Sequence, residues 1–168
     1  MSRRAFTLVE LLVVIAIIGL LSTIGIVAMT SARMQSRNTR RLADMKQLLT
    51  AFQLGFDANG SYPAGQGCIS ATCMYGWSGI AANGTVDAFF SPFLSPKPAY
   101  PSASPPITLG GYIYSGSWGG GTSGYSGITY PAQPILDWAM EGSTNCGFGV
   151  IWSQSASYTE CIFLIKNT

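Results

Sequence analysis

The sequence contains four cysteines, which could form disulfides or bind a metal. All of them follow a long apolar stretch. Only Cys68 and Cys73 stand close together, while Cys146 and Cys161 are well separated. Zinc sites usually combine close cysteine or histidine pairs, and the sequence contains no histidine. The cysteines therefore indicate disulfides formed in an oxidising compartment, with three connectivities open at this point.

A single carboxylate stands at the start of the apolar stretch. Glu10 precedes residues 11–32, which carry no charge, and the next charged residue is Arg33. An acidic side chain deep in a membrane costs about 2.5 to 3.5 kcal/mol on insertion scales. Glu10 is therefore either the partner of a cation or a first-turn residue at the headgroup boundary, where the helix dipole favours it.

Residues for catalysis are scarce. The sequence has no histidine, no Gly-x-Ser-x-Gly segment and no phosphate-binding loop, so the common nucleophile and base arrangements lack parts. Asp137, Glu141 and Glu160 are candidates for a calcium site, but no clustered Asp-x-Asp-x-Gly pattern supports one. The second part of the chain is mildly acidic, which gives nucleic-acid binding no electrostatic support. We expect no enzyme activity and no cofactor.

The elements that hold these residues begin with a long helix. Only 10% of residues are charged and 48% are hydrophobic, so part of the chain must avoid water. Residues 11–32 would form a helix of about 33 Å, enough for a hydrocarbon core of about 30 Å. The helix then turns amphipathic, and Asn59-Gly60 predicts its end near Asp57. Its later apolar residues recur at spacings of three and four: Leu42, Met45, Leu49, Phe52 and Phe56.

The remainder, residues 58–168, is rich in Gly, Ser and Pro and predicts loops with short elements. We expect an α+β fold with a long N-terminal helix and a small C-terminal antiparallel β-sheet. The amphipathic half of the helix should pack on this head. The short elements expected are a helical turn at 87–90, a strand at 111–115 and a hairpin of strands 148–152 and 158–165.

The N-terminal residues resemble a known processing motif. The order is Arg3-Arg4-Ala5, then Phe6-Thr7-Leu8-Val9-Glu10 and the apolar stretch. This closely resembles the prepilin motif of type IV pilins and type II secretion pseudopilins. The resemblance implies cleavage between Ala5 and Phe6 on the cytoplasmic side and N-methylation of Phe6. The family usually has glycine before the cut, so Ala5 departs from the pattern by one small side chain.

The same resemblance implies how the chain is organised and assembled. It divides the chain into a leader (1–5), a hydrophobic transmembrane and filament-core helix (6–32), an amphipathic helix half (33–57) and a head (58–168). Its partners would be prepilin peptidase, an inner-membrane assembly platform and copies of itself in a helical filament. The subunit would cross the inner membrane once with its head outside, then enter an extracellular or periplasmic filament. Glu10 would pair with the Phe6 amine of the same or an adjacent copy and set the register.

Other interpretations of the apolar stretch remain. A secretory signal cut after Ala32, or an anchor that never assembles, would each explain its length, although Glu10 argues against an ordinary signal. Arginines lie on both sides of the stretch, more of them after it, which opposes the positive-inside rule. The motif and the cysteines favour a cytoplasmic N-terminus. Gly19 and Gly25 permit close helix approach, and no proline occurs before Pro63.

The predicted hairpin bears on the disulfides. Cys146 and Cys161 flank it, and closing a loop of about 15 residues contributes about 3 kcal/mol in the chain-entropy model. This resembles the C-terminal disulfide loop of type IV pilins, and the local pairing with Cys68–Cys73 is favoured. Asn59 and Asn83 each begin a glycosylation triplet, but both precede glycine and favour turns. Pilin, pseudopilin and minor subunit for DNA uptake or adhesion all remain open.

Overall fold

The computed structural model describes residues 6–75, 79–102, 107, 109–118, 122–123, 127, 129–130 and 132–165. It divides into two compact units, Met1–Ser36 and Arg37–Thr168. The expected leader, residues 1–5, lies outside the described residues, and with it Ala5 on the leader side of the expected cut.

Helix α1 (Leu8–Asn59) begins in the first unit. Its described large apolar side chains up to Met29 are exposed, and the helix is long and apolar enough to cross a membrane. Within the apolar part, the Ser22 hydroxyl donates a hydrogen bond to the Ile18 carbonyl at 2.7 Å and the Thr30 hydroxyl donates to the Ile26 carbonyl at 3.1 Å. Such bonds satisfy these hydroxyls without water, so Ser22 and Thr30 are compatible with a membrane interior.

The C-terminus of α1 follows from its turn residues. Gly60 adopts a φ of 74°, which favours glycine, and its N–H donates to the Phe56 carbonyl at 2.7 Å. The Asn59 side chain donates to the Gly55 carbonyl at 2.8 Å. The helix therefore ends two residues beyond the predicted Asp57, at the Asn-Gly pair that predicted its end.

The second unit contains a five-stranded antiparallel sheet in the order β1-β4-β7-β9-β8. The α+β fold class is thus confirmed, with a long N-terminal helix followed by a small antiparallel sheet. Two further strand pairs, β2 with β3 and β5 with β6, are short. The elements of the second unit after α1 are β1 (Gln66–Cys68), β2 (Met74–Tyr75), α2 (Gly84–Phe90), β3 (Leu109–Gly110), β4 (Tyr112–Trp118), β5 (Thr122–Ser123), β6 (Thr129–Tyr130), β7 (Gln133–Glu141), β8 (Val150–Gln154) and β9 (Tyr158–Leu164).

Strand β7 has no counterpart in the elements expected from the sequence. It lies between β4 and β9 and is buried along almost its whole length, so its residues do not alternate between apolar and polar. Pro134 and Asp137 are also unusual in strands. The predicted hairpin, in contrast, is present as β8 and β9, and the predicted helical turn at 87–90 is the second half of α2.

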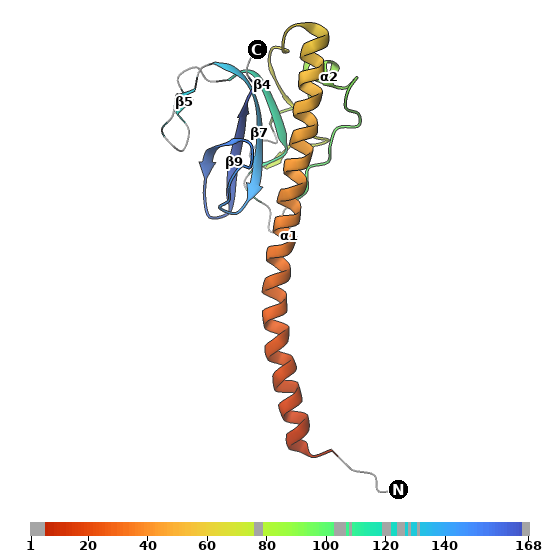
Figure 1. The fold of residues 1–168 in the computed structure, drawn as a ribbon, viewed down its shortest axis with the longest axis vertical. Helices are drawn as coiled ribbons and strands as arrows, with labels where there is room; N and C mark the ends of the chain where they lie inside the picture. Colours follow the sequence, from red (N-terminus) through yellow and green to blue (C-terminus); the bar gives the residue numbers. More distant parts are fainter. Residues whose placement is uncertain are drawn as a thin grey trace. The chain divides into compact units, whose positions relative to one another are not determined.

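The core lies between the second part of α1 and one face of the sheet. In Figure 1 this part of the helix, in orange and yellow, runs beside strands β4, β7 and β9. Phe52 is fully buried and stacks on Tyr114, with ring centroids 4.6 Å apart. Gly55 leaves room for the ring of Phe89 on α2, because a Cβ there would lie 2.6 Å from that ring. The amphipathic stripe predicted from the sequence faces this core.

Candidate processing and assembly site

The start of α1 carries a capping box. Thr7 precedes the first helical residue, and its hydroxyl oxygen accepts a hydrogen bond from the Glu10 N–H at 3.3 Å. In return, Glu10 Oε2 accepts from the Thr7 N–H at 2.8 Å and from the Thr7 hydroxyl at 2.7 Å. Such reciprocal bonds satisfy backbone donors that a helix N-terminus otherwise leaves free. The Thr-x-x-Glu spacing in the sequence signals this arrangement.

The capping box uses one oxygen of the Glu10 carboxylate and leaves the other able to accept a hydrogen bond. All its hydrogen bonds from Thr7 reach Oε2, while Oε1 accepts none from the residues that the structure describes. A negative charge is favoured at this end of a helix by the helix dipole. Glu10 is thus held in a fixed position with one oxygen able to accept a bond from a cation.

Residues around the expected cut are accessible. The Phe6 side chain is 84% exposed, and Leu8 at the start of α1 is 79% exposed. A peptidase must reach the backbone beside Phe6, so this exposure is compatible with cleavage there. Gly19, further along the helix, is open as well, because a Cβ at that position would meet nothing within 4 Å.

In the second unit, α1 is bound to the end of β7 by an ion cluster. Glu141 accepts two hydrogen bonds from Arg37, at 2.7 and 2.6 Å, and pairs with Arg41 Nη1 at 2.7 Å. The Asn38 amide accepts from the Glu141 N–H at 2.9 Å and donates to the Glu141 carbonyl at 3.0 Å. Both Arg41 and Glu141 are buried. No local sequence signal joins residues so far apart, so this cluster could not be predicted from the sequence.

The environment of Glu141 also bears on the calcium alternative. Burial would raise the pKa of Glu141, but the hydrogen bonds from Arg37 and the charge of Arg41 outweigh burial and lower that pKa. Its carboxylate is therefore ionised and occupied by two guanidinium groups. Within the described residues, no group of three or more potential metal ligands is present.

Asp137 and Glu160 form a different acidic pair within the sheet. Burial raises the pKa of Asp137 well above its usual range, and the nearby Glu160 carboxylate raises it further. Glu160 accepts a hydrogen bond from the Ser153 hydroxyl at 2.6 Å, yet burial still raises its pKa. Two carboxyl groups in contact favour sharing a proton. This pair belongs to the interior of the head and is separate from Glu141.

The cysteines form two disulfides, Cys68–Cys73 and Cys146–Cys161, which are the pairs favoured from the sequence. The second bond joins strand β9 to the segment that precedes β8. Gly111 lies against the first bond with a φ of 132°, and a Cβ there would be 2.6 Å from Cys73 Sγ. Both disulfides therefore fix loops of the head.

Comparison with known proteins identifies the N-terminal segment. Residues 1–26 match the family model of the prokaryotic N-terminal methylation motif. No curated protein and no solved structure matches the chain. The match includes Ala5, Phe6, Thr7 and Glu10 and ends within the exposed apolar part of α1. The family is structural rather than catalytic. The chain therefore carries the signal of type IV pilins and pseudopilins, which implies processing by prepilin peptidase and assembly into a filament.

Proposed function

We propose that this chain is a structural subunit of a type IV pilus or a related extracellular filament. Prepilin peptidase would remove residues 1–5 and methylate Phe6, and the mature subunit would polymerise through its N-terminal helix. The observation that carries this proposal is the methylation motif joined to an exposed apolar helix. Before assembly, residues 6–32 would lie in the inner membrane, with residues 33–57 as the amphipathic helix half and 58–168 as the head outside.

An exposed apolar helix requires other molecules to cover it. Leu11, Ile15 and Ile18 are each more than half exposed in the free chain. Lipid can cover them before assembly, and helices of neighbouring copies can cover them in a filament. An assembly platform would move the subunit from the first environment to the second without exposing these side chains to water.

Glu10 supplies what apolar packing lacks, which is a preferred register. Cleavage before Phe6 would create an α-amine one residue before the capping box. Glu10 Oε1 would accept a hydrogen bond from the α-amine of an adjacent copy. Glu10 Oε2 would keep its hydrogen bonds from Thr7. A carboxylate among apolar side chains is strongly disfavoured without a cationic partner. A subunit that packs at another axial position would leave Glu10 unpaired, so that position would be less stable.

The disulfides support a head outside the cytoplasm. Bonds such as Cys146–Cys161 persist in oxidising compartments and are rare in the cytosol. A head outside would leave the N-terminus on the cytoplasmic side, where the peptidase would act. Lack of labelling of Cys68 and Cys146 by a cytoplasmic thiol reagent is the expected result in intact cells.

The mature N-terminus tests the proposal. Sequencing and mass analysis of filament or membrane fractions should find Phe6 with a methylated amine as the first residue. Met1 as the first residue would contradict processing, and Arg33 would indicate an ordinary secretory signal. Ala5→Gly should be processed at least as efficiently as the natural chain, whereas Ala5→Arg should block processing.

Glu10→Gln tests the assembly role more sharply than Glu10→Ala. Glutamine also forms capping boxes, so this variant keeps the helix start but removes the charge. We expect normal membrane insertion and a loss of filaments of about tenfold or more, since tenfold corresponds to only about 1.4 kcal/mol. Wild-type levels of incorporation would leave Glu10 an ordinary helix-start residue.

A secretion pseudopilin is the second candidate function. It is favoured by the uninterrupted helix, since α1 contains no proline from Leu8 to Asn59. The proline that the family associates with melting of the helix in type IV pilins is missing here. Deletion of the chain distinguishes the two functions, because loss of surface fibres supports a pilus and loss of protein export with no fibres supports a pseudopilin.

A further inference from the structure

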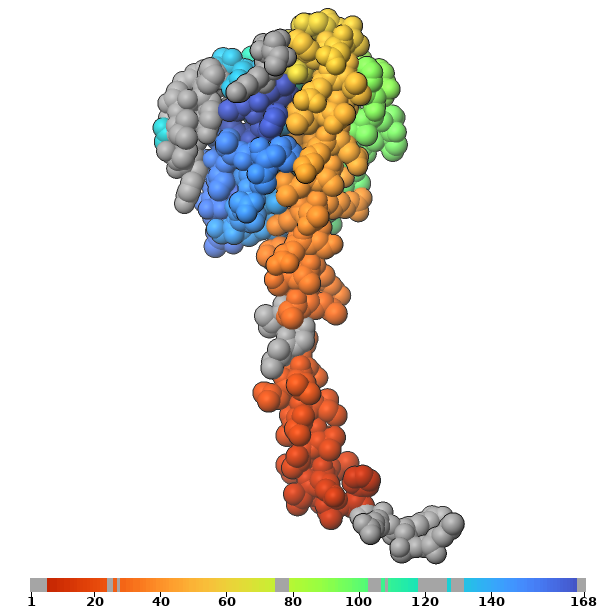
Figure 2. Space-filling model, in the orientation of Figure 1, coloured from red at the N-terminus to blue at the C-terminus, as the bar shows by residue number. Residues whose placement is uncertain are grey.

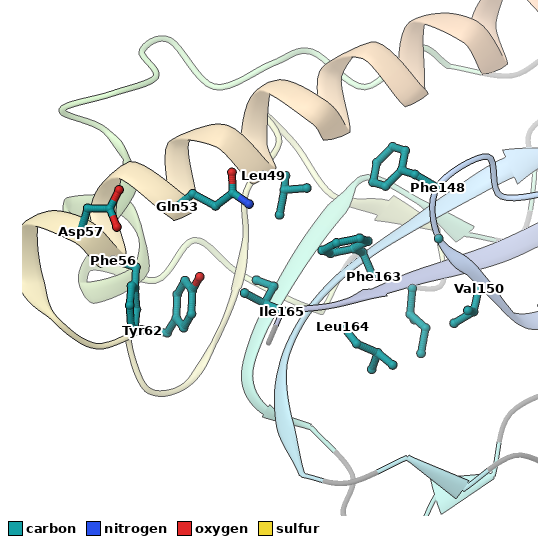
Figure 3. Close-up of a pocket in the computed structure, with 12 residues that line it drawn as sticks. Leu49, Gln53, Phe56, Asp57, Tyr62, Phe148, Val150, Phe163, Leu164 and Ile165 are labelled. Carbon is teal, nitrogen blue, oxygen red and sulfur yellow. The ribbon is translucent and has the colours of Figure 1, made fainter. Parts of the chain in front are cut away.

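A groove of about 580 Å³ runs beside the second part of α1, between the helix and the end of the sheet. Leu49, Gln53 and Asp57 line its helix side at spacings of four residues. Phe163 and Ile165 line its sheet side (Figure 3). In Figure 2 this region follows the seam between the blue C-terminal strands and the yellow-orange helix surface.

The groove is apolar along most of its length and acidic at one end. Asp57 is the sole charged residue among its described lining residues, and it lies near the C-terminus of α1. Asp57 is exposed and forms no ion pair with any residue that the structure describes. An occupant should therefore be apolar and should end in a cation at the Asp57 end.

One segment of the chain itself has this composition. Ile26, Met29 and Arg33 follow one another at spacings of three and four, so they share one face of the helix. Ile26 is 69% exposed and Met29 is 57% exposed. Arg33 is also exposed, and none of the described carboxylates pairs with it. The stripe is apolar and ends in a cation at its C-terminal end.

We propose that the groove of one copy receives the Ile26–Met29–Arg33 stripe of a second copy, with Arg33 paired to Asp57. In parallel helices this pairing sets an offset of 24 residues, which places Met29 level with Gln53 and Ile26 within one residue of Leu49. The lengths agree, because at about 1.5 Å per residue Ile26 to Arg33 covers about 10 Å and Leu49 to Asp57 about 12 Å. An antiparallel stripe would place Arg33 among the apolar residues of the groove, where its charge has no partner.

This contact joins two different surfaces, the stripe of one copy and the groove of the next. Such a heterologous contact can repeat without limit, and it builds open helical assemblies when the rotation does not close a ring. The inference rests on the proposed function and adds a second contact to it, distinct from the contact of Glu10 with the Phe6 amine. The Glu10 contact would fix the axial offset between the N-termini of adjacent helices. The Arg33–Asp57 contact would fix which neighbouring head each helix packs against.

Exchange of the two charges tests the contact in the full chain in cells. Arg33→Asp and Asp57→Arg should each reduce the yield of sheared filaments about tenfold or more, because each creates a like-charge pair at every interface. The double variant should restore the yield to within about twofold of the natural chain, since the pair is re-formed with opposite orientation. Arg40→Asp is the matched control, because Arg40 is also exposed on α1 without an ion pair among the described residues, and its yield should not change.

Immunoblots of the membrane fraction should find equal amounts of every variant, which excludes a defect in insertion as the cause. A photo-crosslinking residue at Met29 in the double variant and in the natural chain should capture 49–57 or 163–165 of another copy. Unrescued single variants, together with crosslinks confined to 6–32 of other copies, would overturn this contact while leaving the filament itself in place. A natural chain that forms no filament would instead overturn the proposed function.

Discussion

The side chains in the two parts of α1 differ in where their contacts come from. From Phe6 to Met29, the described large apolar side chains are exposed, and the hydroxyls of Thr7 and Ser22 bond to groups of the same helix end. From Arg37 onward, the helix buries Met45, Leu48 and Phe52 and uses Arg37 and Asn38 to contact the sheet. One continuous helix therefore has a half whose contacts are completed by its own head and a half whose contacts must come from other molecules.

The largest expected effect concerns the ion cluster of the head half. Glu141→Ala would leave Arg41 fully buried without an anion, and breaking a buried pair in this way costs about 3 to 5 kcal/mol. Urea unfolding of the full chain in detergent micelles measures this loss. Asp87→Ala, which removes a partly exposed pair with Lys97, should cost at most about 1 kcal/mol and serves as the control. Equal effects would contradict a special role for the cluster.

Two leucines of the same helix compare its halves directly. Leu48 is fully buried and Leu20 is 67% exposed. Leu48→Ala should lower the free energy of unfolding of the head by about 2 to 5 kcal/mol through lost burial and a cavity. Leu20→Ala should leave head unfolding unchanged and reduce filament yield instead. The same urea titration and a filament assay check both, and head destabilisation by Leu20→Ala would break the distinction between the halves.

The acidic pair of the sheet predicts a dependence on pH. Because the pKa of Asp137 is raised in the folded chain, its contribution to stability is full below its ordinary pKa and is lost as pH rises through the raised value. Glu141 acts in the opposite sense, since its lowered pKa makes its contribution disappear as pH falls. Asp137→Asn should therefore remove much of the decline in melting temperature toward alkaline pH. If the melting temperature of this variant still declines as pH rises, the decline would be due to Glu160. The variant Glu160→Gln tests that assignment.

The smallest expected effect concerns the helix start. Thr7→Ala removes the cap and should destabilise the first turn of α1 by about 1 kcal/mol, whereas Thr7→Ser should retain the cap. Faster amide hydrogen exchange at the start of α1 in micelles would report the loss, with no change in the head. Equal exchange in Thr7→Ala and the natural chain would mean that Glu10 is held without Thr7.

Local patterns made much of the fold predictable. The charge-free residues 11–32, the spaced apolar residues after them and the Asn59-Gly60 turn act through neighbours in sequence, and the helix and its end followed from them. Strand β7 could not be predicted in this way, because both its faces are buried and its pattern does not alternate. The pairing of Arg41 with Glu141 joins distant residues of a kind that is usually solvated at the surface.

The candidate site was predictable to a similar degree. Phe6 and Glu10 were recognised by their motif, while Thr7 was overlooked although its spacing to Glu10 is the usual signal for a capping box. The groove beside Leu49 and Asp57 could not be found from sequence, because its far wall comes from β9 at the other end of the chain.

The bonds of Asn38 have a mechanical consequence. Its amide bonds both the N–H and the carbonyl of Glu141, at the end of β7, and β7 is paired with β4 on one side and β9 on the other. If the helix is pulled while the head is held, the force would pass through Asn38 to β7. It would therefore reach the central strand of the sheet before either edge strand. Pulling β7 out requires two ladders of backbone hydrogen bonds to shear together, whereas an edge strand of this sheet is held by one.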